Sequence, residues 1–142
     1  MMQTVRRKGT ISNEAASKAV SAAVEKGLGL GCRVAVAVVD DCGNLVAFQR
    51  TDGAYLPSTS IAQDKAYTAA GFGIPTAHLY QHVKESPLLL ETLVGRERLV
   101  FLAGGLPIIV EGEVVGAIGC SGGNEEQDAT CAAAGLAAIG IH

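Results

Sequence analysis

The chain has 142 residues and a mass of 14.5 kDa, with 49% hydrophobic and 18% charged residues and a formal net charge of −3 at pH 7. This length suits one domain with a sizeable core, and the acidic balance does not favour a nucleic-acid or membrane partner. The sequence contains no run of about 18 apolar residues that would cross a bilayer, and no apolar segment follows its charged start as in a secretory signal. We therefore expect one cytoplasmic domain over residues 1–142, in which residues 1–11 form a flexible N-terminal arm.

Small side chains dominate the composition, with 18 glycines, no tryptophan and only 4% aromatic residues. Backbones can approach closely where side chains are small, within one subunit or between two. A surplus of apolar residues in so short a chain also favours burial between subunits. We therefore expect a homo-oligomer.

The four cysteines are spaced too irregularly for a known metal pattern. They are Cys32, Cys42, Cys120 and Cys131, and none of their spacings matches a zinc or iron–sulfur site. We expect reduced, mostly buried thiols, no disulfide framework and no assigned metal site.

Hydrophobic spacing and turn residues predict five helices and five strands. In chain order these are a helix at 13–26, strands at 33–39 and 45–50, helices at 58–70, 76–84 and 87–93, strands at 98–103, 106–111 and 114–120, and a helix from 125 onward.

Capping residues mark the first and last of these helices. Ser12 or Asn13 is placed to cap the first helix, and Asn124 is placed to cap the last. Gln127 follows Asn124 by three residues, which is the spacing of a capping box.

Two hairpins are predicted, one in each half of the chain. Residues 40–44 favour a turn because Asp, Gly and Asn tolerate left-handed backbone conformations, and Glu111-Gly112 suits a two-residue hairpin turn. Hairpins at both ends of the strand order indicate one antiparallel sheet with helices on one face, an α+β architecture.

The segment 119–123, Gly-Cys-Ser-Gly-Gly, allows two functional interpretations, a phosphate-binding loop and a nucleophile elbow, and the surrounding residues disfavour both. A phosphate-binding loop would carry a G-x-G-x-x-G or Gly-Lys-Ser/Thr pattern, whereas here three acidic residues follow in the first helical turn. A nucleophile elbow at Ser121 needs a histidine later in the chain, and the only one is the last residue, His142. Tight strand packing and a sharp turn into the helix explain these glycines better.

His78 and His82 lie four residues apart on a predicted helix, with Glu85 about one turn further on the same face. This spacing can hold a divalent metal, or one histidine can serve as an axial haem ligand. The alternative is a solvated helix face beside Gln81 and Lys84.

Mixed charges gather where the first hairpin leads into the second helix. Arg50 and Asp52 lie in the loop, and Asp64 and Lys65 lie on the helix. Arg50 and Asp52 can bind a carboxylate-bearing ligand or perform acid–base chemistry. From residue types alone we favour a structural ion pair that fixes the loop.

Four segments of the chain together carry a family resemblance. They are VDDCGNLVAFQRTDGA at 39–54, SIAQDKAYTA at 60–69, GGLP at 104–107 and GAIGCSGGNEEQD at 116–128. In this order they resemble the GlcG/HbpS family, which includes the C-terminal domain of PduO-type proteins and small proteins of diol and glycerol utilisation operons.

The resemblance implies a profilin-like fold, with a five-stranded antiparallel sheet flanked by helices, and a homo-oligomer. It also implies binding or degradation of haem, or an accessory role in glycolate, diol or glycerol utilisation. We expect a small-ligand-binding protein whose ligand is haem or another tetrapyrrole, with His78 or His82 on the iron and Arg50 or Lys65 pairing with the propionates. We expect neither the exported sensing role of HbpS-type members nor the adenosyltransferase activity of PduO proteins, because the sequence shows neither a leader nor the upstream domain.

Two other functions are open at this point. One is an enzyme that acts on a small hydroxy acid or aldehyde, with Asp40, Asp52 and Lys65 as acid–base groups. The other is a scaffold or assembly factor for an enzyme of the same pathway.

Overall fold

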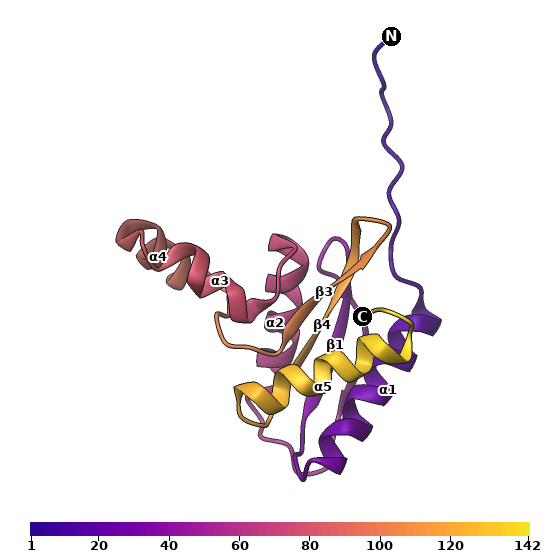
Figure 1. Cartoon of the computed structure of the whole chain (residues 1–142), viewed down its shortest axis with the longest axis vertical. Helices are drawn as coiled ribbons and strands as arrows, with labels where there is room; N and C mark the ends of the chain where they lie inside the picture. Colours follow the sequence, from indigo (N-terminus) through magenta and orange to yellow (C-terminus); the bar gives the residue numbers. More distant parts are fainter.

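A four-stranded antiparallel sheet lies between two layers of helices in the computed structural model, which describes all 142 residues (Figure 1). In chain order the elements are α1 (Asn13–Gly29), β1 (Ala35–Asp40), β2 (Leu45–Arg50), α2 (Ser58–Phe72), α3 (Thr76–Val83), α4 (Pro87–Val94), β3 (Gly105–Val110), β4 (Glu113–Ser121) and α5 (Glu125–Ala138). The predicted α+β class with an antiparallel sheet is confirmed. No helix is both long enough and apolar enough to span a membrane.

Both predicted hairpins form, and they join through β1 and β4. The strand order is β2-β1-β4-β3, and the central pairing runs from Ala35 opposite Ser121 to Asp40 opposite Gly116. The turn between β3 and β4 has positive φ at Glu111 (52°) and Gly112 (77°). Left-handed conformations at both central residues are typical of a two-residue hairpin.

Residues 98–103 form an irregular segment against α2, and the prediction of a strand there is wrong. Arg98 has a φ of 68°, which a bulky residue does not adopt in a strand. The Thr68 hydroxyl accepts a hydrogen bond from the N–H of Val100 and donates one to the carbonyl of Arg98. A side chain of α2 thus satisfies backbone groups that a neighbouring strand would otherwise pair, and the sheet has four strands rather than five.

Helices cover both faces of the sheet, which corrects the prediction of one covered face. Val34, Val36 and Val38 pack in a cluster with α1 and α5, while Ala35 and Ala37 pack in a second cluster with α2. Successive side chains of a strand point to opposite faces, so a strand that is apolar at every position needs a cover on each side.

The side of the sheet under α2 is built from very small residues. A Cβ added at Gly119 on β4 would overlap the carbonyl oxygen of Ala62 and lie 2.6 Å from the nitrogen of Ala66. The backbone of α2 therefore lies directly against that of β4, which explains the alanines and glycines on both elements.

The predicted caps of the first and last helices are present. Ser12 accepts a hydrogen bond from the N–H of Ala15 at 3.1 Å. Asn124 and Gln127 form a reciprocal capping box at the start of α5. These contacts satisfy N–H groups that a helix leaves without a partner in its first turn.

The outer edge of the sheet is blocked along β3. Pro107 has no N–H to offer a further strand. At Gly105, the Thr76 hydroxyl accepts a hydrogen bond from the N–H at 2.9 Å and lies 3.4 Å from the carbonyl oxygen, to which it donates. These two residues leave β3 few free backbone groups for pairing with another chain.

Two parts of the chain project from this body (Figure 1). Residues 1–10 are exposed along their whole length, and the chain joins the body where the N–H of Ile11 bonds the carbonyl of Val115. The helices α3 and α4 extend to the other side, and α4 has no buried residue.

We predict that Gly119→Ala destabilises the protein by about 3 kcal/mol, because the added methyl group forces α2 away from β4. Urea unfolding followed by circular dichroism measures this change. The matched control is Gly29→Ala on α1, where an added Cβ meets no atom within 4 Å. Equal stability of the two variants would contradict the close contact between α2 and β4.

Candidate functional site

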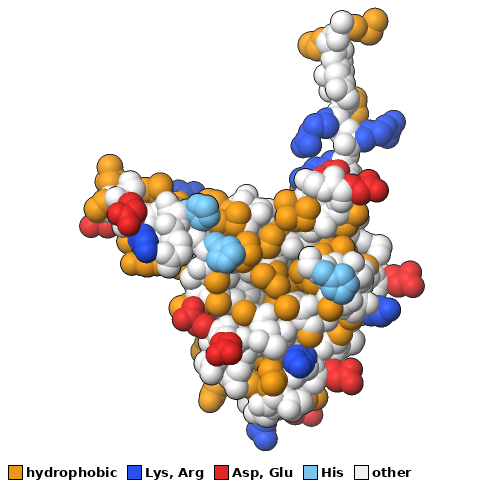
Figure 2. All heavy atoms as spheres, viewed as in Figure 1, with side chains coloured by type: hydrophobic (Ala, Val, Ile, Leu, Met, Phe, Trp, Pro, Cys, Tyr) orange, Lys and Arg blue, Asp and Glu red, His pale blue; other side chains and the backbone are white.

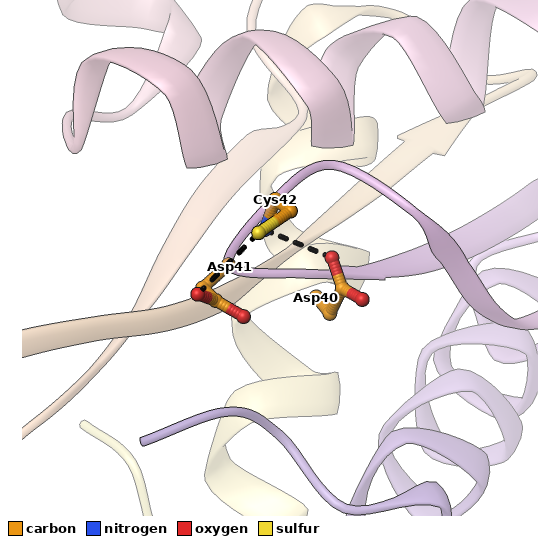
Figure 3. Close-up of side chains that lie close together, drawn as sticks. All are labelled: Asp40, Asp41 and Cys42. Atoms are coloured by element: carbon orange, nitrogen blue, oxygen red, sulfur yellow. Dashed lines mark hydrogen bonds between the residues drawn. The ribbon is translucent and has the colours of Figure 1, made fainter. Parts of the chain in front are cut away.

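Asp40, one of the predicted acid–base residues, holds the turn between β1 and β2 (Figure 3). Its Oδ1 accepts hydrogen bonds from the N–H groups of Cys42 and Asn44, each at 2.9 Å, and its Oδ2 accepts from the Asn44 side chain at 3.2 Å. An aspartate that bonds the backbone two residues on is a common turn device. The structure therefore favours a structural role for Asp40.

Asp40, Asp41 and Cys42 form the one group of three metal-ligand side chains whose ligand atoms lie within 4.8 Å of one another (Figure 3). These atoms already have partners. Asp41 pairs with Lys8 at 3.3 Å, and the Cys42 thiol donates to Asp41 at 3.7 Å. The cluster is explained by the turn and by attachment of the N-terminal arm, and we assign no metal to it.

Asp52 lies at the opposite end of the β1–β2 hairpin from Asp40. Asp40 precedes the turn, whereas Asp52 follows the end of β2, where Arg50 pairs with Ala35. Strands of this length extend for about 20 Å, so the two carboxylates do not share a site. Arg50 and Asp52 are both exposed, and the favoured ion pair between them is absent.

Lys65, expected near a ligand, is instead fully buried on α2. Its side chain is 2% exposed, and its Nζ donates hydrogen bonds to Asp128 Oδ2 on α5 and to the Cys120 carbonyl on β4, both at 2.9 Å. Burial raises the pKa of Asp128, while Lys65 and the N–H groups of Gly123 and Gly122 act in the opposite direction. The ammonium group has no open side for a propionate, so the structure favours a structural role for Lys65.

Two glycines make room for this ion pair. A Cβ at Gly104 would lie 2.8 Å from Lys65 Nζ and 2.6 Å from the Cys120 carbonyl oxygen, and its φ is 123°. A Cβ at Gly105 would lie 2.6 Å from Thr76 Cγ2. Gly104 is thus required by the contact between α2 and α5, and Gly105, the first residue of β3, by the close approach of α2 and Thr76, rather than by a ligand.

His78 and His82 lie exposed on α3, one helical turn apart. They form no close metal-ligand group with Glu85. On the face seen in Figure 2, histidine side chains border hydrophobic ones that gather over α3 and the β3–β4 hairpin. Exposed apolar residues of this region include Tyr80 and Ile109. The two imidazoles are therefore free to reach an external ligand.

A cleft of about 460 Å³ lies between α2 and α4, and we call it the α2–α4 cleft. Phe72, Leu93 and Leu99 supply apolar walls, and Arg96 supplies a positive charge. Tyr67 also lines it, with its ring under the Arg98 guanidinium at 4.0 Å. Glu97 also lines the cleft, so it holds one acidic and one basic residue. The apolar walls together with Arg96 suit a flat apolar ligand whose carboxylate lies on the Arg96 side.

Comparison with known proteins identifies the family. A family model for haem degrading protein HbpS-like matches residues 11–137, most of the chain. The chain belongs to the HbpS-like family. The predicted membership of the GlcG/HbpS family is therefore confirmed.

Individual proteins match most or all of the chain. An uncharacterized 15.0 kDa protein in the dhaT-dhaS intergenic region of Citrobacter freundii is 39% identical over 120 residues, which are 84% of each chain. The crystal structure of Klebsiella pneumoniae protein ORFY has a TM-score of 0.93 at 30% identity and covers 100% of this chain and 99% of its own. A crystal structure of a PduOC–haem complex has a TM-score of 0.85 at 31% identity, with 94% and 97% covered.

Two residues of these sites were not singled out from the sequence. Asp128 was noted only as an acid in the first turn of α5, and Arg96 was not named as a candidate. A signal for Asp128 existed, because Lys65 falls on the apolar stripe of α2 and a buried lysine requires a buried partner. No comparable signal marks Arg96, whose surroundings include α2 residues far from it in the sequence.

We predict that Asp128→Asn costs about 3 to 5 kcal/mol of stability, because it leaves the Lys65 ammonium group buried without a counter-charge. Chemical denaturation measures the loss. The control is Asp64→Asn, which removes the partner of Arg98 in a pair with 43% and 27% exposed side chains, and which we expect to cost less than about 1 kcal/mol. Similar losses in both variants would show that the Lys65–Asp128 pair is not buried as described.

Proposed function

We propose that this protein binds haem or a related tetrapyrrole on the side formed by α2, α3 and α4. The observation that carries the proposal is the similarity to the PduOC–haem complex, with a TM-score of 0.85 over 94% of the chain. The description of the matching family as haem degrading gives further support.

The α2–α4 cleft has the chemistry that a tetrapyrrole needs. The macrocycle has two flat apolar faces, which suit Phe72, Leu93 and Leu99, and its propionates suit a guanidinium. Arg96 is better placed for this role than Arg50, which lies at the end of β2, or Lys65, which is buried.

The proposed iron ligand is His78 or His82. Both are exposed on α3, which follows α2 and precedes α4 in the chain, and both lie outside the lining of the cleft itself. A neutral imidazole is a common axial ligand of haem iron. When bound, the haem would supply the redox chemistry of its iron, and the residues of this chain would hold and orient it.

Titration of the purified protein with hemin tests this function. We expect a shifted Soret band that saturates, and we expect replacement of both histidines, His78→Ala with His82→Ala, to shift the band again by removing the iron ligand. His142→Ala is the matched control, because this exposed histidine lies at the C-terminus and not on α3. A titration without a Soret shift would contradict haem binding, and an unchanged spectrum in the double variant would contradict the proposed ligand.

We also propose that the protein is a homo-oligomer that covers part of the projecting α4. Leu88, Leu89 and Val94 on this helix are 77%, 44% and 62% exposed. Exposed apolar side chains grouped on one element favour burial against another chain. We expect sedimentation equilibrium to give a multiple of the 14.5 kDa chain mass, and replacement of Leu88 by Glu to lower it. A wild-type mass of one chain would contradict the proposal.

A further inference from the structure

A second cleft opens where β1 begins and β4 ends, and it shares no lining residue with the α2–α4 cleft. Its volume is about 700 Å³, and we call it the Arg33 cleft. Backbone atoms of Gly31, Gly53, Gly122 and Gly123 form much of its wall. The side chains that give it its chemistry are Arg33, Tyr55, Asn124 and Gln127.

The capping box fixes which way the two amide side chains face. Asn124 Oδ1 accepts from the N–H of Gln127 at 2.8 Å, and Gln127 Oε1 accepts from the N–H of Asn124 at 2.9 Å. Both amide oxygens are therefore occupied inside the protein. Both NH₂ groups are left without a protein acceptor, and an NH₂ group can only donate. The capping box thus supplies the cleft with donors.

Arg33 adds the only formal charge among the residues that line the cleft. Its guanidinium takes part in none of the three ion pairs of the chain and has no hydrogen-bond acceptor in the protein. It lies across Gly53, where an added Cβ would come 3.3 Å from Arg33 Cδ and closer still to Nη1. The glycine therefore lets the arginine lie flat along the loop that follows β2.

The nearby acidic residues of α5 do not occupy the cleft. Glu125 Oε1 accepts from the N–H of Ala103, and Asp128 is held by Lys65 and by the N–H of Gly123. Their negative charges and that of Glu126 in the same turn still repel a dianion at this end of α5 more strongly than a monoanion. A ligand with one negative charge meets the guanidinium with less repulsion than a phosphate would.

We propose that the Arg33 cleft binds a small molecule through a single carboxylate group. The Arg33 guanidinium donates two parallel hydrogen bonds to the two carboxylate oxygens. The NH₂ groups of Asn124 and Gln127 donate to the same ligand. The exposed Tyr55 contributes a hydroxyl and an aromatic face to the rest of the molecule. This site is separate from the α2–α4 cleft, and the inference does not depend on haem binding.

An NMR titration of ¹⁵N-labelled protein with sodium propionate tests the inference, at constant ionic strength maintained with sodium chloride. We expect saturable shifts of the amide signals of Gly53, Gly122 and Gly123. Propionamide, which has the same shape without the charge, should produce no saturable shift, and inorganic phosphate should bind more weakly than propionate. Equal shifts with propionamide, or tighter binding of phosphate, would overturn the assignment.

Two variants separate ligand binding from folding. Arg33→Gln removes an exposed charge, and we expect it to weaken propionate binding roughly 10- to 100-fold. Gln127→Glu keeps the capping box, since glutamate is equally suited to this position, but replaces a donor with a negative charge. We expect it to retain the melting temperature and to lose binding.

Arg50→Gln is the matched control, because Arg50 is an exposed arginine that does not line the cleft. We expect it to bind propionate as the wild type does. Wild-type affinity in both Arg33→Gln and Gln127→Glu would overturn the proposal. Hemin binding should persist in both variants, so failure of this proposal is distinguishable from failure of haem binding.

Discussion

The buried ion pair between Lys65 and Asp128 is the contact on which much of this structure depends. It joins α2 on one face of the sheet to α5 on the other, and it adds a bond from Lys65 to the Cys120 carbonyl on the strand between them. Burying two charges is costly, so the pair persists only with its hydrogen bonds complete. This requirement places glycine at position 104, where any side chain would displace the ammonium group. The segments 60–69, 104–107 and 116–128, which carry the family resemblance, thus meet in one packed junction.

The polar groups of this chain fall into two sets: those bonded inside the fold, as in this junction, and those that remain available to ligands. The signature residues Asp40, Lys65 and Asp128 use their polar atoms inside the fold, in a turn and in the ion pair. Groups without a protein partner lie elsewhere, on the exposed face of α3 and in the Arg33 cleft. In this chain Asp40, Lys65 and Asp128 therefore report on architecture, whereas Asn124 and Gln127 of the segment 116–128 both cap α5 and line the Arg33 cleft.

Local signals in the sequence predicted most of the fold, and contacts between distant segments account for the errors. The capping box of Asn124 and Gln127 depends on residues three apart and was predicted correctly. The apolar residues at 98–103 resembled a strand, but Thr68, thirty residues earlier, binds their backbone instead. Lys65 was taken for a ligand-binding residue for the same reason, since its partner lies 63 positions away. Arg33 could not be recognised as a candidate binding residue from the sequence, because its cleft forms only where β1, β4 and the loop after β2 meet.

Pro107 and Thr76 also limit how copies of this chain can be combined. Pro107 has no N–H to donate, and the Thr76 hydroxyl already bonds the N–H and the carbonyl of Gly105. The strand β3 therefore cannot readily continue the sheet into a neighbouring molecule. Growth by strand addition is open-ended, and it is the geometry of fibrils. Contacts through helices instead use shaped side-chain surfaces that match one orientation. Pro107 and Thr76 together therefore keep copies of this chain from extending the sheet continuously through β3.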